Sequence, residues 1–131
     1  MNGNIVKVYS KAKDGNTKLS TNFKVKEFAC LDGTDTIFVS DELVKVLQKV
    51  RDNFGKPVII NSAYRTESHN KKVGGSANSQ HKYGMAADIR INGVSPKTIA
   101  TYINKLMPDR GGIGVYTSFV HIDVRAKKSR W

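Results

Sequence analysis

The residues of this chain best suited to chemistry are histidines and aspartates that lie close together in two separate segments. His81 and Asp88 are seven residues apart in SQHKYGMAADI, and His121 and Asp123 are two residues apart in FVHIDVR. On a β-strand, side chains two residues apart point to the same face. His121 and Asp123 are therefore expected to share one face of a strand whose other face is apolar.

Together the two segments offer His81, Asp88 and His121 as a set of three metal ligands, with Asp123 beside them. Two imidazoles, one carboxylate and an open fourth position form a typical catalytic zinc site. A further carboxylate is the kind of base that metal-assisted hydrolysis uses. The alternative is structural: a surface His81, an Asp88 at a strand end, and a His121–Asp123 pair bonded to backbone. The chain has no HExxH motif, so spacing alone leaves both interpretations open and favours the structural one.

Two amphipathic helices and several short strands must position these residues. Ser40 is a good N-cap for a helix that Gly55 and Pro57 end. Ser95 and Pro96 begin a second helix, which ends before Pro108. A short helix is expected over residues 67–73, and buried strands are expected at PVIIN and MAADIRI, followed by a hairpin of GIGVY and FVHIDV. Since helices and strands do not alternate strictly, the predicted class is α+β, with a small, mostly antiparallel sheet flanked by helices.

The first forty residues carry weaker signals. We expect a strand from Ile5 to Tyr9, then a polar stretch, a strand or one helical turn at FKVKEFAC, and a turn-rich LDGTDTIFV. A length of 131 residues predicts one domain, residues 1–131. Cys30 lies in an apolar context and is expected to be a buried, inert thiol.

The composition bears on partners and location. The net charge of +11, from 22 Lys and Arg against 11 Asp and Glu, suits a polyanion: nucleic acid, an anionic membrane face or an anionic cell wall. Nucleic acid is disfavoured because no recognition motif accompanies the charge. No apolar run approaches the roughly 20 residues that span a bilayer. The N-terminus has no apolar core of a signal peptide, so we expect synthesis in a cytoplasm without one.

The segment SQHKYGMAADI matches the SxHxxGxAxD signature of the zinc D-Ala-D-Ala metallopeptidase family, which is related in fold to the hedgehog signalling domain. INSAYRTESHNKKVGGSANSQHKYGMAADI resembles the first half-site of that family, and GGIGVYTSFVHIDVR resembles the second half-site in the subgroup with HxD. The resemblance covers residues 20–125, so the expected fold is a hedgehog/DD-peptidase-like domain with that core.

The resemblance implies roles for individual residues. His81, Asp88 and His121 would bind one Zn²⁺ per chain, with water as the fourth ligand. Gly84 would let the chain turn so that His81 and Asp88 converge. In the remaining roles, Ser79 would lie near the metal or the substrate, and Arg65 would stabilise the substrate carbonyl or carboxylate. Apart from the resemblance, Tyr116 is a candidate to line the cleft and contact substrate, with packing in the core or at the rim as the alternative. His69 is interpreted as structural or near the substrate groove.

One departure concerns the base. Well-known relatives carry an acidic residue three positions before the third ligand, where this chain has Ser118. Asp123 is therefore assigned as the base, and His121 as the ligand. Other relatives have HxH with the second histidine as ligand, and that alignment would make Asp123 the ligand and His121 the acid or base.

The implied function is hydrolysis of an amide bond in the peptidoglycan stem peptide, either a D,D bond or the L-Ala–D-Glu bond. The expected setting is a monomeric phage-type lysin, such as an endolysin, which acts on the wall after release and contacts anionic wall polymers. One alternative is a non-catalytic zinc-binding module that recognises a partner. The other is a basic nucleic-acid-binding domain.

Overall fold

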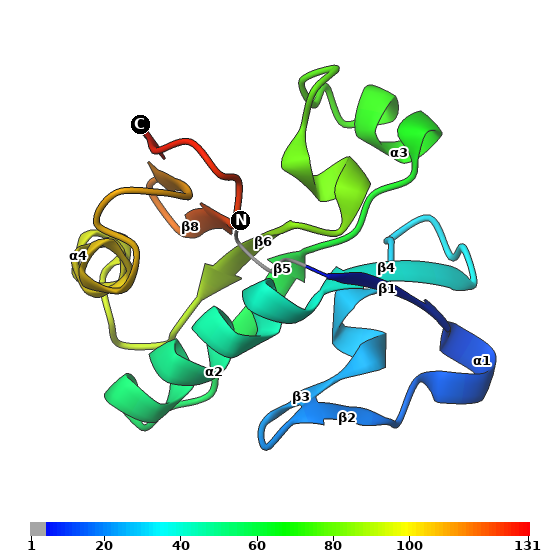
Figure 1. Ribbon diagram of the computed structural model, residues 1–131, viewed down its shortest axis with the longest axis horizontal. Helices are drawn as coiled ribbons and strands as arrows, with labels where there is room; N and C mark the ends of the chain where they lie inside the picture. Colours follow the sequence, from blue (N-terminus) through cyan, green and yellow to red (C-terminus); the bar gives the residue numbers. More distant parts are fainter. Residues whose placement is uncertain (1–4) are drawn as a thin grey trace.

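The computed structural model describes residues 5–131, which form three antiparallel-rich sheets, α-helices and two 3₁₀ turns (Figure 1). The strands are β1 (Val6–Ser10), β2 (Lys18–Ser20), β3 (Phe23–Lys24), β4 (Thr36–Ser40), β5 (Ile59–Ser62), β6 (Ala86–Arg90), β7 (Gly112–Val115), β8 (Val120–Asp123) and β9 (Ser129–Arg130). The helical elements are α1 (Lys11–Asp14), α2 (Asp41–Phe54), α3 (Glu67–Lys72), α4 (Pro96–Leu106), η1 (Val25–Phe28) and η2 (Gln80–Tyr83). Within residues 5–131, no helix has the length and apolarity needed to cross a membrane.

The main sheet has five strands in the order β5-β6-β8-β7-β9. Its neighbours are antiparallel except β7 and β9, which run parallel. Two smaller antiparallel pairs, β1 with β4 and β2 with β3, lie beside it. This is an α+β fold with a mostly antiparallel sheet, so the predicted fold class is confirmed.

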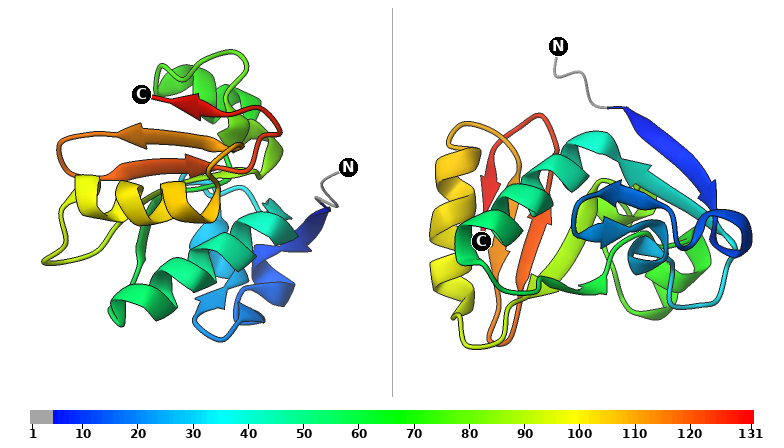
Figure 2. Two further views of the ribbon diagram at one scale, coloured as in Figure 1. Left: turned by 60° about the vertical axis from the view of Figure 1, so that its left-hand side comes forward. Right: turned by 90° about the horizontal axis from the view of Figure 1, so that it is seen from below.

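Both predicted long helices form, with the predicted caps. The Ser40 side chain accepts a hydrogen bond from Leu43 N, and Gly55 ends α2 in the left-handed conformation at φ 64°. The Ser95 side chain caps α4 in the same way. The apolar faces of α2 and α4 join one core with the inward side chains of the sheet, and α4 lies across the β7–β8 hairpin (Figure 2).

Strand register positions the residues of interest. Asp88 on β6 pairs directly with His121 on β8, and Ala86 pairs with Asp123. Their sequence neighbours Ile89 and Ile122 are fully buried in the core with α4. Because successive side chains alternate between faces, Asp88 and His121 emerge on the face of the sheet opposite α4.

Three segments differ from the sequence expectations. PVIIN forms the edge strand β5, so its isoleucines are half-buried and not fully buried. LDGTDTIFV is turn-rich only in its first half, because Thr36–Ser40 forms β4 and pairs with β1. Within the basic tail RAKKSRW, Ser129–Arg130 forms β9, which adds a parallel partner to β7. Each difference arises from pairing between segments distant in sequence.

Candidate metal centre

Two histidines and one aspartate converge on the face of the sheet opposite α4. His81 Nε2 and His121 Nδ1 each lie 3.2 Å from Asp88 Oδ1. Asp88 comes from β6, His121 from the adjacent strand β8, and His81 from η2. All three residues are at least 92% buried. The ligand atoms of these residues lie within 4.8 Å of one another.

The arrangement fits a tetrahedral metal ion. Zinc bonds of about 2.0–2.1 Å at tetrahedral angles separate ligand atoms by about 3.3 Å, close to the observed 3.2 Å. The carbonyl oxygen of Ala63 accepts a hydrogen bond of 2.7 Å from His81 Nδ1. This contact fixes the ring so that Nε2 faces the carboxylate of Asp88. Two electron-rich groups facing each other in a buried site require a cation or a proton between them.

His121 is oriented in the same manner, by a carboxylate. Its Nε2 lies 2.7 Å from Asp123 Oδ2, which leaves Nδ1 to face Asp88. A ligating histidine whose second nitrogen donates to a carboxylate or carbonyl is the usual arrangement around bound zinc. The candidate ligand atoms are therefore His81 Nε2, His121 Nδ1 and an oxygen of Asp88.

Asp123 lies behind His121 and has no exposed surface. Its Oδ1 accepts hydrogen bonds from the backbone N–H of Gly112, and from the backbone N–H and Nε of Arg125. Its Oδ2 accepts from His121 and from Arg125 Nη2 at 2.7 Å. Asp123 does not line the cavity over the cluster. The sequence led us to expect that the carboxylate of Asp123 is free to act as a base. In the structure, both of its oxygens already accept hydrogen bonds.

The charges of the cluster are strongly coupled. Burial alone would raise the pKa of Asp88, but hydrogen bonds from His121 and His81 outweigh it and hold that pKa well below its usual range. Burial also opposes ionisation of Asp123, yet His121 and Arg125 lower its pKa. Burial would lower the pKa of His121, but its bonds to Asp123 and Asp88 raise the pKa above the ordinary value. Both carboxylates are thus anions, and Asp88 is the one that faces the two imidazoles where a cation would bind.

A glycine-dependent turn brings His81 to Asp88. Gly84 ends η2 in the left-handed conformation at φ 71°, and a Cβ there would fall on the carbonyl oxygen of Phe38. The Ser79 side chain caps η2 by accepting a hydrogen bond from His81 N at 3.3 Å. Glycine is therefore required at position 84 by both conformation and space, as the turn predicted from the sequence demands.

A cavity of about 570 Å³ lies over the cluster, and Arg65, Ser79 and Tyr116 line it. Arg65 Nη2 lies 3.3 Å from Asp88 Oδ2, and its other nitrogens donate to Ser62 and Asn70. The three residues predicted to meet substrate thus share one cavity with the cluster. His69 is not among the residues that line it.

Arg125 and Trp131 also line this cavity, and sequence reasoning assigned neither of them a role. The ring centroid of Trp131 lies 5.0 Å from that of His121, and Arg125 lies over the indole at 5.5 Å. Trp131 Nε1 donates a 2.8 Å hydrogen bond to Tyr116 Oη, and Tyr116 stacks on Phe119. Only the parallel pairing of β9 with β7 brings Trp131 here, and no local pattern in RAKKSRW indicates that pairing.

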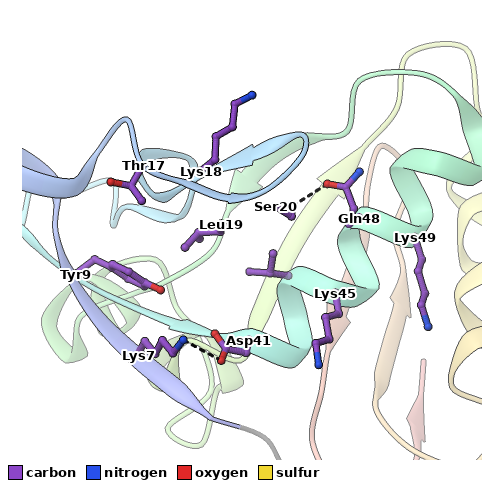
Figure 3. A pocket seen from close by; sticks show the side chains of 11 residues that line it. Lys7, Tyr9, Thr17, Lys18, Leu19, Ser20, Asp41, Lys45, Gln48 and Lys49 are labelled. Atoms are coloured by element: carbon purple, nitrogen blue, oxygen red, sulfur yellow. Dashed lines mark hydrogen bonds and ion pairs between the residues drawn. The ribbon is translucent and has the colours of Figure 1, made fainter.

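A second hollow of about 640 Å³ lies away from the cluster, between β1, β2 and the first half of α2 (Figure 3). We call it the lysine groove. Lys7, Lys18, Lys45 and Lys49 line it, with Tyr9 at one end. Lys7 pairs with Asp41 at 3.4 Å. The side chains that can hold a metal ion are those of the candidate metal centre. The lysine groove is therefore a candidate for binding only.

Comparison with known proteins agrees with this geometry. A segment of 44 residues is 46% identical to the zinc D-Ala-D-Ala carboxypeptidase of Streptomyces albus G. That segment covers 33% of this chain and 17% of the relative, so the chain spans only a small part of that protein's length. The family model described as Peptidase M15 matches residues 21–123, a range that contains His81, Asp88, His121 and Asp123. The chain belongs to the Peptidase M15 family.

Proposed function

We propose that this protein is a zinc-dependent peptidase that hydrolyses an amide bond in the stem peptide of peptidoglycan. The observation that carries the proposal is the convergence of His81, His121 and Asp88 at 3.2 Å separations beneath an open cavity. Membership of the Peptidase M15 family and the local identity to a zinc D-Ala-D-Ala carboxypeptidase support the same chemistry.

In this proposal, His81 Nε2, His121 Nδ1 and the carboxylate of Asp88 would hold the metal. Bound there, zinc would supply Lewis-acid chemistry, polarising a carbonyl and lowering the pKa of water toward neutrality. Ala63 and Asp123 keep the two imidazoles in the tautomers that ligation needs.

Arg65 is proposed to act on the substrate carbonyl or carboxylate. Its side chain is only 15% exposed and lines the cavity beside Asp88. A fixed guanidinium in a partly desolvated cavity stabilises a developing negative oxygen more strongly than one in water. Ser79 and Tyr116 line the same cavity and are proposed substrate contacts.

We assign Asp123 as a positioning residue that acts through His121. The assignment as base, taken from the sequence, needs an oxygen that can reach the cavity. Both oxygens of Asp123 are instead bonded to His121, Arg125 and Gly112. Among residues 5–131, the cavity lining contains no carboxylate or imidazole beyond the three clustered groups.

The lysine groove is proposed to contact anionic wall polymers. Lys18, Lys45 and Lys49 border it, and the whole chain carries a net charge of +11. Such charge favours association with a polyanion and makes it sensitive to salt. A single-domain, monomeric lysin of phage type that acts on the wall after release fits this partner.

The test is digestion of purified sacculi by wild type and His81→Ala, with and without a chelator. We expect wild type to release new amino groups, and chelation or His81→Ala to abolish release. Mass spectrometry of the fragments then distinguishes a D,D bond from the L-Ala–D-Glu bond. Full, chelator-resistant activity of His81→Ala would refute the zinc site.

The two alternative functions give different results in the same experiment. Stoichiometric zinc without any release of amino groups would favour a partner-recognition module. Salt-sensitive DNA binding by a protein without zinc would favour the nucleic-acid-binding domain. A matched control is Lys105→Ala, an exposed lysine on α4 outside the candidate metal centre; it should digest sacculi like wild type.

A further inference from the structure

We propose that the chain holds a second transition-metal site, formed by Cys30, Asp32 and His69 and separate from the candidate metal centre. One thiol, one carboxylate oxygen and one imidazole nitrogen of these residues lie within 4.8 Å of one another. None of the three residues lines the cavity over His81, Asp88 and His121. The proposal does not depend on the peptidase function.

Two short segments, far apart in sequence, bring these groups together. Cys30 and Asp32 lie in one turn, which Gly33 N closes by donating to Cys30 O at 3.2 Å. His69 lies in the first turn of α3, whose N-cap is Thr66. Tyr64 N donates to Phe28 O, so the strand leading to α3 runs beside the end of η1. The turn and the helix therefore present their side chains to the same point.

The donor set is typical of zinc and related transition metals. Thiolate and imidazole are soft or borderline ligands that Mg²⁺ and Ca²⁺ do not select. Zinc bonds of about 2.0–2.3 Å require ligand atoms roughly 3.3–3.7 Å apart. Asp32 is exposed and His69 is half-buried, so both side chains have room to adjust around a metal ion.

The surroundings already orient the carboxylate. Asp32 Oδ1 accepts from Thr34 N at 2.9 Å, and Asp32 Oδ2 accepts from Thr66 Oγ1 at 2.8 Å. Thr66 Oγ1 also lies 4.0 Å from the buried Cys30 Sγ. Such hydrogen bonds to ligating groups are characteristic of metal sites, and metal binding would release the thiol proton to solvent.

A metal here would fix α3 to the turn after η1, and this bears on Arg65. Asn70 of α3 accepts from Arg65 Nη1 at 3.2 Å and donates to Ser76 O at 2.8 Å. The second site thus braces the segment that holds Arg65 beside Asp88. With this second site the chain would bind two metal ions, where the sequence led us to expect one. Cys30 and His69 would then be ligands, where we expected an inert thiol and a structural histidine.

Cobalt substitution of the full chain tests the proposal. We expect the stripped protein to bind two equivalents of Co²⁺, with a near-ultraviolet charge-transfer band from a thiolate–cobalt bond. His81→Ala should lose one equivalent and keep the band, because its cluster contains no sulfur. Cys30→Ser should lose one equivalent together with the band.

The half-buried His69 offers a second variant should Cys30→Ser fold poorly. His69→Gln is expected to lose one equivalent of Co²⁺, while the exposed neighbour Ser68→Ala keeps both. A wild-type protein that binds one equivalent without the band, or a band that survives Cys30→Ser, would overturn the second site. Both readouts measure cobalt binding and not digestion of sacculi, so failure of the second site and failure of the peptidase function are distinguished.

Discussion

Replacing Asp123 by asparagine separates a positioning role from a base. The oxygen Oδ2 of Asp123 lies 2.7 Å from His121 Nε2, and the carboxylate is fully buried. An asparagine here keeps its one oxygen as acceptor for Gly112 N and Arg125 Nε. Its amide N–H₂ group then faces His121 and Arg125 Nη2. Two donors face each other there, so the orienting hydrogen bond of His121 is lost.

The size of the effect follows from that bond. A hydrogen bond to a charged group contributes about 1.5–3 kcal/mol, and each 1.4 kcal/mol is about a tenfold change in an equilibrium constant. We expect the zinc affinity of Asp123→Asn to fall by roughly 10- to 100-fold, the range typical for residues that orient metal ligands. Activity at saturating zinc should largely recover.

Two measurements decide the question: zinc affinity by competition with a chelating dye, and sacculus digestion at saturating zinc. The exposed Asp109→Asn is the matched control and should change neither. Gly112→Ala should weaken zinc binding too, because a Cβ there would fall on the carboxylate of Asp123. Wild-type zinc affinity with activity reduced by about 10²–10⁴-fold at full occupancy would identify Asp123 as the base and refute this reasoning.

Three further predictions concern the turn at Gly84, the indole of Trp131 and the protons released when zinc binds. Gly84→Ala should lower the free energy of unfolding by at least about 1 kcal/mol, since alanine resists the left-handed conformation and its Cβ meets Phe38; an unchanged melting temperature would contradict this. Trp131→Ala should raise KM and leave zinc stoichiometry unchanged, because the indole packs on His121 without ligating; loss of zinc would count against that role. Zinc binding should release protons and weaken as the pH falls, because the metal-free contacts raise the pKa of His121 above its ordinary value; calorimetric titration in two buffers of different ionisation enthalpy measures the release, and equal observed heats in the two buffers would argue against it.

Local sequence was enough to predict much of the fold. The caps Ser40 and Ser95 and the stop at Gly55 act within one or two turns of a helix, so the bounds of α2 and α4 followed from local chemistry. The strands β6, β7 and β8 contain apolar residues that indicate a core-facing side, although their polar residues Asp88, His121 and Asp123 are buried as well. By contrast, β9 has no apolar residue of its own and forms because β7 pairs with it, while the apolar residues 37–39 follow a turn-rich segment and form β4 by pairing with β1.

For the candidate metal centre, the sequence by itself determined the types of ligand and their order along the chain, since His81, Asp88 and His121 are the right donors and the family signature selects them. Only the tertiary structure decided how they meet: the register of β6 against β8 sets Asp88 beside His121. Tertiary packing also buried Asp123 behind an imidazole, and carried Trp131 to the cavity and Cys30 to His69. These contacts join residues distant along the chain, and their geometry depends on packing that no local spacing encodes.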